Sequence, residues 1–129
     1  DTINIIENGQ ESVIFDNKDK RITAQSIDLK NNFATIQEES SGIFSANSVI
    51  NIINVESKNT QNYTVETSVK EMYTKGDVIA LNLGTEIEFI NTGGWLVKRY
   101  IANQEVSNVT VSDNIAGIIY RDKVEIINL

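Results

Sequence analysis

The sequence contains neither cysteine nor histidine. Without cysteine, the chain has no disulfide framework, no thiolate nucleophile and no cysteine-ligated zinc or iron–sulfur site. Without histidine, it lacks the commonest general base, the commonest metal ligand and the partner of every Ser–His or Cys–His nucleophile. Because few enzymes work without histidine, we expect no catalytic activity, no cofactor and no metal site.

Long apolar runs are missing as well. No stretch approaches the about 20 residues that span a membrane, so we expect no membrane contact by this segment itself. The first residues, Asp1, Thr2 and Ile3, carry neither an initiator methionine nor a signal-peptide profile. Such a start is compatible with a trimmed piece of a longer protein and does not establish it.

Positive charge is scarce and dispersed. The chain has 11 Lys and Arg residues against 18 Asp and Glu, which gives a net charge of −7. Such a chain repels phosphate backbones, and its basic residues form no patch, so we expect no nucleic-acid partner. With 129 residues and 40% hydrophobic content, it buries one core and forms a single domain or part of one.

The informative feature of the sequence is an internal repeat. Three similar segments follow one another at intervals of 37 residues: INIIN at 50–54, IEFIN at 87–91 and VEIIN at 124–128. A degraded fourth copy, VIFDN, lies one interval earlier at 13–17. The spacing needs no gap, so these segments indicate a structural unit about 37 residues long.

Other positions share this interval. Tyr63 and Tyr100 are 37 residues apart, and the segments that precede the copies correspond at residues 41–44, 78–81 and 115–118. Within a unit, short runs of Ile, Val, Tyr, Phe and Thr alternate with Gly, Asn, Asp and Ser, as in strands joined by tight turns. The clearest unit predicts four strands, at residues 69–74, 77–83, 86–90 and 96–102.

The first and third positions of each copy are apolar and point to one face of a strand. The pairs are Val13 and Phe15, Ile50 and Ile52, Ile87 and Phe89, and Val124 and Ile126. A lone four-stranded sheet cannot cover this face, so we expect each sheet to pack on the next copy. A period near 40 with four strands is typical of propeller blades. The sequence thus predicts an all-β protein of four-stranded antiparallel blades, a β-propeller or partial propeller.

The expected blades of this single propeller-like domain are residues 1–31, 32–67, 68–104 and 105–129. In this register the chain starts at the second strand of one blade and ends at the third strand of another, an arc of about three and a half blades. Propellers close a ring of typically 4–8 blades. We therefore expect either further blades in a longer protein or a homodimer through the open blade edges, since exposed edges invite pairing.

Parts of the chain resemble a known family. Residues 75–81, 94–100 and 116–127 are similar to the C-terminal blades of membrane-anchored, propeller-like (WD40-like) proteins of clostridia and their relatives. The resemblance is clearer in the second half of the chain and includes no functional motif. It implies an N-terminal membrane anchor and further blades outside this sequence, and hence an extracytoplasmic, cell-surface location in a Gram-positive bacterium. It implies no activity.

The motifs of better-known propellers are absent. The Gly-His and Trp-Asp pairs of the WD40 repeat are missing, and the single tryptophan, Trp95, is followed by Leu96. The kelch di-glycine occurs once, at Gly93 and Gly94, and not in every copy. No activity can therefore be transferred from these classes.

Three residues are candidates for a recognition patch: Trp95, Arg99 and Tyr120. Aromatic and arginine side chains dominate interface hot spots, and aromatic rings stack on sugars. For Tyr63 and Tyr100, their equivalence in the repeat favours packing between blades. The asparagine that closes each copy could line a sugar or cation site, but a turn is the simpler interpretation.

Two functions of different classes remain. The first is a non-catalytic binding or scaffold module that presents a protein- or glycan-interaction surface, with protein or cell-wall glycan as the partner. The alternative is a carboxylate-dependent carbohydrate-active enzyme. Glu88 and Glu125 occupy equivalent positions, and glycoside hydrolysis requires paired carboxylates. A solvated strand face explains both more simply, so we favour the binding module and assign no catalytic residue.

Overall fold

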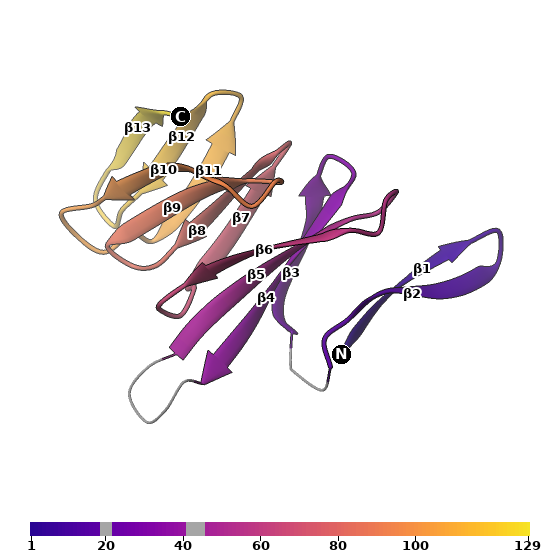
Figure 1. The fold of residues 1–129 in the computed structure, drawn as a ribbon. Coiled ribbons are helices and arrows are strands. Elements are labelled where there is room, and N and C mark those ends of the chain that lie inside the picture. The colour runs from indigo at the N-terminus through magenta and orange to yellow at the C-terminus, as the bar shows by residue number, and fades with distance from the viewer. Residues whose placement is uncertain (19–21, 41–45) are drawn as a thin grey trace.

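The computed structural model describes residues 1–18, 22–40 and 46–129, and all regular structure in these residues is β-strand (Figure 1). The strands are β1 (Thr2–Glu7), β2 (Gln10–Asp16), β3 (Ile22–Leu29), β4 (Asn32–Ser40), β5 (Ala46–Asn54), β6 (Thr60–Val65), β7 (Glu71–Lys75), β8 (Val78–Asn82), β9 (Glu86–Asn91), β10 (Leu96–Ile101), β11 (Asn108–Ser112), β12 (Ile115–Ile119) and β13 (Val124–Asn128). The prediction of an all-β protein is confirmed.

Strands that are neighbours in the chain pair antiparallel and form small sheets. We call them the N-terminal hairpin (β1 and β2), the first four-stranded sheet (β3 to β6), the middle sheet (β7 to β10) and the C-terminal sheet (β11 to β13). Among the described residues, no sheet closes on itself. The four strands predicted for the clearest unit are the strands of the middle sheet, with ends shifted by at most two residues.

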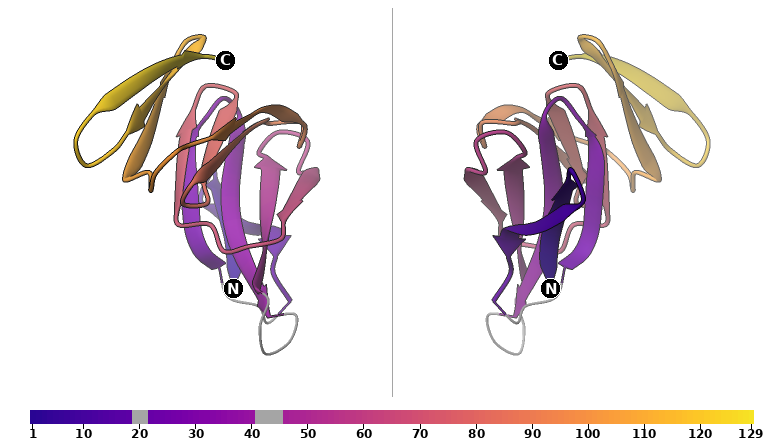
Figure 2. Two further views of the ribbon diagram at one scale, coloured as in Figure 1. Left: turned by 90° about the vertical axis from the view of Figure 1, so that its left-hand side faces the viewer. Right: turned by 90° about the vertical axis from the view of Figure 1, so that its right-hand side faces the viewer.

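The sheets follow one another through space in chain order, from the N-terminal hairpin to the C-terminal sheet (Figures 1 and 2). In the middle sheet, β8 and β9 are buried on both faces. In β8, Ile79 and Leu81 pack against the first four-stranded sheet, whereas Ala80 packs against the C-terminal sheet. In β9, Ile87 and Phe89 join the core shared with the C-terminal sheet. The alternation of side chains along a strand therefore builds two cores, one on each side of the middle sheet.

The first strands of successive sheets lie beside each other. β3 contacts β7, and β7 contacts β11. Leu29 and Gly76 form a parallel bridge, and the backbone N–H of Lys30 donates a hydrogen bond of 2.8 Å to the carbonyl oxygen of Gly76. The sheets are thus joined along one edge as well as through their faces.

Three of the repeated segments occupy the third strand of a sheet, namely β5, β9 and β13. In β5 and β9 the first and third positions are buried between sheets, as the sequence predicts. At the chain's two ends this prediction is wrong. Val124 and Ile126 in β13 are 59% and 65% exposed, because no described strand packs on their face. In β2, Val13 is 56% exposed, whereas Ile14, which lies at a register shift in the pairing with β1, is buried.

The segment at 41–44 that corresponds to part of β8 in the sequence lies outside the described residues. The first four-stranded sheet begins at Ile22 and ends at Val65. Residues 31 and 32, between which we expected one blade to end and the next to begin, lie where the chain turns from β3 into β4 of this sheet.

Candidate functional site

Trp95 is the most exposed large aromatic side chain of the site candidates, with 73% of its surface accessible. It ends the loop between β9 and β10, and Asn91 holds this loop in shape: the Asn91 Oδ1 accepts hydrogen bonds of 3.0 and 3.1 Å from the backbone N–H groups of Gly93 and Trp95. A Cβ atom at residue 93 would lie 3.0 Å from the Trp95 Cδ1. Glycine at this position therefore lets the indole lie against the backbone of the loop.

A hollow of about 280 Å³ lies beside this loop. Its lining carries no charged side chain and consists of Asn32, Ile52, Asn54, Ser57, Asn59, Gln61, Thr92 and Gly93. The side-chain oxygen of Asn54 is already engaged, since it accepts hydrogen bonds from the backbone N–H groups of Glu56 and Ser57. The amides of Asn59 and Gln61 are exposed, so this surface offers neutral hydrogen-bonding groups next to an indole.

The turn interpretation is confirmed for two of the repeated asparagines. Asn54 and Asn91 both use the side-chain oxygen to bind backbone N–H groups of the following turn. Such bonds replace the strand ladder where the chain reverses direction.

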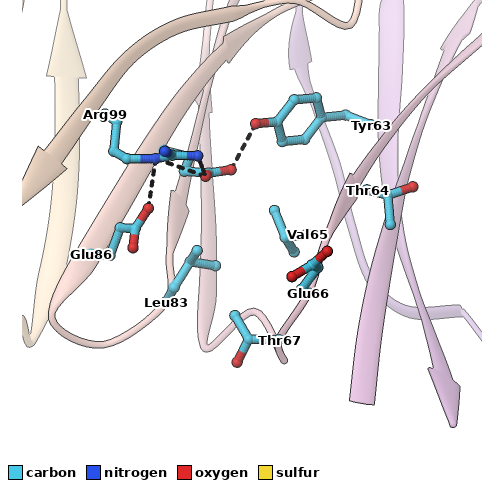
Figure 3. Close-up of a pocket in the computed structure, with 9 residues that line it drawn as sticks. Tyr63, Thr64, Val65, Glu66, Thr67, Leu83, Glu86 and Arg99 are labelled. Atoms are coloured by element: carbon cyan, nitrogen blue, oxygen red, sulfur yellow. Dashed lines mark hydrogen bonds and ion pairs between the residues drawn. The ribbon is translucent and has the colours of Figure 1, made fainter. Parts of the chain in front are cut away.

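Arg99 lies in a different place, in a cavity of about 570 Å³ between β6 and the middle sheet (Figure 3). In β10 it stands directly opposite Glu88 of β9. The Arg99 Nη2 is 2.7 Å from the Glu88 Oε1, and its Nε is 2.7 Å from the Glu86 Oε1. Across the cavity, the Tyr63 hydroxyl donates a hydrogen bond of 2.8 Å to the Glu88 Oε2. Glu88, only 5% exposed, therefore has both carboxylate oxygens occupied.

Tyr120 is buried in a second cluster, between the middle and C-terminal sheets. Its hydroxyl donates a hydrogen bond of 3.1 Å to the Glu125 Oε2 and lies 3.2 Å from the hydroxyl of Tyr100. Tyr100 also donates to Glu125. Lys123 completes the cluster, with its Nζ 2.5 Å from the Glu125 Oε1 and 5.0 Å from the centre of the Tyr120 ring.

The two clusters share one arrangement, which we call the Tyr–Glu tie. In each, a tyrosine from the fourth strand of one sheet donates to a glutamate in the third strand of the next sheet: Tyr63 to Glu88 and Tyr100 to Glu125. A cation balances the charge of each glutamate: Arg99 from the neighbouring strand for Glu88, and Lys123 from the turn before β13 for Glu125. The expected role of the tyrosines in packing between sheets agrees with these contacts.

These contacts keep the three candidate binding residues apart. Trp95 is exposed on a loop, Arg99 is engaged by two carboxylates, and Tyr120 is buried in a Tyr–Glu tie. In the sequence, the two tyrosines are 37 residues apart, and so are the two glutamates. This spacing did not show that each tyrosine contacts a glutamate. The common spacing of 25 residues within both pairs was the available signal.

The hydrogen bonds of the Tyr–Glu ties shift the pKa values of Tyr63, Tyr100 and Glu125. Burial, followed by the hydrogen bond to Glu88, raises the pKa of Tyr63 to about 12. The hydrogen bond to Glu125 is the main cause of the raised pKa of Tyr100. The bonds from Lys123 and Tyr100 lower the pKa of Glu125 from 4.5 to about 2. At neutral pH the raised pKa values keep Tyr63 and Tyr100 protonated, and the lowered pKa keeps Glu125 ionised.

Acid should weaken the tie between Tyr100 and Glu125. A carboxylate whose pKa is lower in the folded chain contributes stability above its unfolded pKa, and this contribution is lost as the pH falls toward the folded value. For Glu125 that window runs from about 4.5 down to about 2. We expect the midpoint of thermal unfolding to fall less steeply over this window in Glu125→Gln than in the unmodified chain.

Glu56→Gln, in an exposed turn, is the control and should keep the steep acid dependence. Equal slopes for Glu125→Gln and the unmodified chain would show that the tie does not lower the pKa of Glu125 in the folded chain.

The described residues contain no cluster of three or more acidic side chains placed to hold a metal ion. No helix capable of crossing a membrane occurs among them either. Comparison of the chain with protein-family models, with curated proteins and with solved structures returns no significant match.

Proposed function

We propose that this chain is a non-catalytic binding module, an arc of a β-propeller that presents an interaction surface. The propeller assignment is supported by sheets stacked in chain order and by first strands that lie side by side, as strands around a propeller axis do. The resemblance described above supports a further proposal, that the module stands at the cell surface on an anchor outside this sequence.

The observation that carries the binding function is the exposed Trp95 on the loop whose residues Thr92 and Gly93 line the uncharged hollow. The indole offers an apolar face for stacking, and the neighbouring lining offers amide and hydroxyl groups without charge. Hydroxyl-rich neutral glycans match this combination, because their ring faces stack on aromatic side chains and their hydroxyls bond to amides. We therefore favour cell-wall glycan over protein as the ligand of this surface.

The carboxylates give less support to the alternative, a carbohydrate-active enzyme. Glu88 and Glu125 lie on different sheets, and each is engaged by its own tyrosine and its own cation. Glycoside hydrolysis requires two carboxyl groups that flank one bond. Their contacts favour a role of both glutamates in joining the sheets.

Tryptophan fluorescence tests the proposal directly, because Trp95 is the only tryptophan in the chain. We expect chitooligosaccharides, which are neutral, to change its emission in a saturable way, because a bound sugar replaces water around the indole. Polygalacturonate should have no such effect, since the chain carries a net charge of −7.

Calorimetry on variants provides the matched control. Gln61→Ala should weaken glycan binding by about fivefold, the effect of about 1 kcal/mol for one hydrogen bond. Gln10→Ala, on the N-terminal hairpin, should leave it unchanged. Emission that does not respond to any of these glycans would contradict the proposal. Glycan cleavage that is lost in Glu88→Gln would instead support the enzyme.

A further inference from the structure

The loop that carries Trp95 contacts the first four-stranded sheet at the hollow of about 280 Å³. A Cβ atom added to Gly94 would lie 3.5 Å from the Cβ of Gln61, a residue that lines the hollow. Gly93, against which the indole of Trp95 lies, lines the hollow as well. A ligand that occupies the hollow therefore lies next to the loop that presents the indole.

Leu96 adds a second exposed apolar side chain directly after Trp95, with 44% of its surface accessible. It pairs with Ile90 of β9, and Ile90 packs in the core shared with the first four-stranded sheet. Residues paired across two strands share one face of the sheet. Leu96 thus lies on the face of the middle sheet that is turned toward the first four-stranded sheet, between which and the loop the hollow lies.

The first four-stranded sheet shows what the fold itself requires at the position of Trp95. In the middle sheet, the carbonyl oxygen of Trp95 accepts a hydrogen bond of 3.0 Å from the backbone N–H of Asn91. In the first four-stranded sheet, the carbonyl oxygen of Asn59 accepts the corresponding bond of 2.9 Å from Asn54, one interval before Asn91. Asn59 and Trp95 are therefore equivalent in the structure, and both are exposed.

The same comparison holds for Leu96. Its partner Ile90 is equivalent to Ile53, one interval earlier, and Ile53 pairs with Thr60. Thr60 is exposed, as Leu96 is. One sheet thus carries polar residues at both positions and the next sheet carries apolar residues at both. The packing of the fold does not explain this apolar pair.

We propose that the ligand of this surface is a glycan of N-acetylated amino sugars, an inference that rests on the glycan-binding function proposed above. A sugar with hydroxyl groups alone offers one apolar ring face, which stacks on Trp95, and nothing apolar for Leu96. An acetamido group adds a methyl group that packs on Leu96. It also adds an N–H donor and a carbonyl acceptor that match the side-chain amides of Asn59 and Gln61 in the hollow. Like the lining of the hollow, it carries no charge.

Two trisaccharides test this inference. Tri-N-acetylchitotriose and cellotriose are both neutral and have the same linkage, and they differ only in the acetamido group that replaces one hydroxyl on each ring. Titrations followed by the fluorescence of Trp95 should give an affinity about tenfold higher for tri-N-acetylchitotriose, the combined effect of one methyl contact and one hydrogen bond. Equal affinities would overturn this inference and leave the proposed binding function in place. An absence of response to both sugars would overturn the binding function, and this inference with it.

A variant of Leu96 tests the contact with the methyl group. Leu96→Thr should reduce the ratio of the two affinities from about tenfold to about threefold, because it removes the apolar partner of the acetamido methyl group. Ile101→Thr makes the same kind of change at the other end of β10, where Ile101 is 65% exposed, and should keep the full ratio. A ratio that does not fall in Leu96→Thr, or that falls equally in Ile101→Thr, would contradict the proposed site.

Discussion

Phe89→Ala should lower the free energy of unfolding by about 3–5 kcal/mol, the range for removing a buried phenylalanine side chain. Phe89 is fully buried in the core between the middle and C-terminal sheets, where it packs with residues of both. Truncation removes its apolar contacts and leaves a cavity that two rigid sheets fill poorly. Urea unfolding at neutral pH measures the change.

The control for this variant is Ile101→Ala, which truncates an exposed apolar side chain on the same sheet. Its effect should stay within about 0.5 kcal/mol, as for most surface substitutions. A similar small loss for Phe89→Ala would mean that the C-terminal sheet does not pack on the middle sheet as described.

Glu88→Ala should cost about 2–3 kcal/mol. The substitution removes the charged acceptor of the half-buried Tyr63 hydroxyl, and a hydrogen bond to a charged group contributes about 1.5–3 kcal/mol. It also removes one partner of Arg99, but this loss is small because Arg99 is half-exposed and keeps its contact with Glu86. Chemical denaturation again provides the measurement, with Glu56→Ala as the exposed carboxylate that should have little effect.

A double-mutant cycle with Tyr63→Phe separates the energy of the hydrogen bond between Tyr63 and Glu88 from the other effects of removing Glu88. If the hydroxyl and the carboxylate stabilise each other, the loss in the double variant should be smaller than the sum of the two single losses by about 1 kcal/mol. Additive losses would indicate that Tyr63 and Glu88 stabilise the chain separately and that the tie does not join the sheets.

The sequence predicted the strands well because their signals are local. In the middle sheet, turn residues such as Gly76 separate runs of β-branched and aromatic residues, and alternation along β9 identified Ile87 and Phe89 as core positions. Alternation assigns a side chain to a face but does not tell what covers that face. Ile126 occupies the same position in the repeat as Phe89, but Phe89 is buried and Ile126 is exposed. The difference arises because burial depends on whether another sheet packs on that face.

The candidate site was harder to predict because its contacts join separate sheets. Residue type suggested that Arg99 and Tyr120 were free to bind a ligand. The register between β9 and β10 instead places Arg99 opposite Glu88, and the stacking of the sheets buries Tyr120 beside Glu125. Trp95 is the exception: it lies on a loop, and its exposure follows from the local turn that Asn91 makes.

The spacing within the Tyr–Glu ties limits how such a chain can change length during evolution. In both ties the tyrosine and its glutamate are 25 residues apart, and the intervening stretch contains the first two strands of the next sheet. Adding or deleting a whole unit keeps each tyrosine opposite a glutamate. An insertion within β7 or β8, by contrast, would shift the acceptor strand and leave a phenol facing apolar neighbours. Length variation should therefore occur in complete units or in exposed turns such as the one after β5.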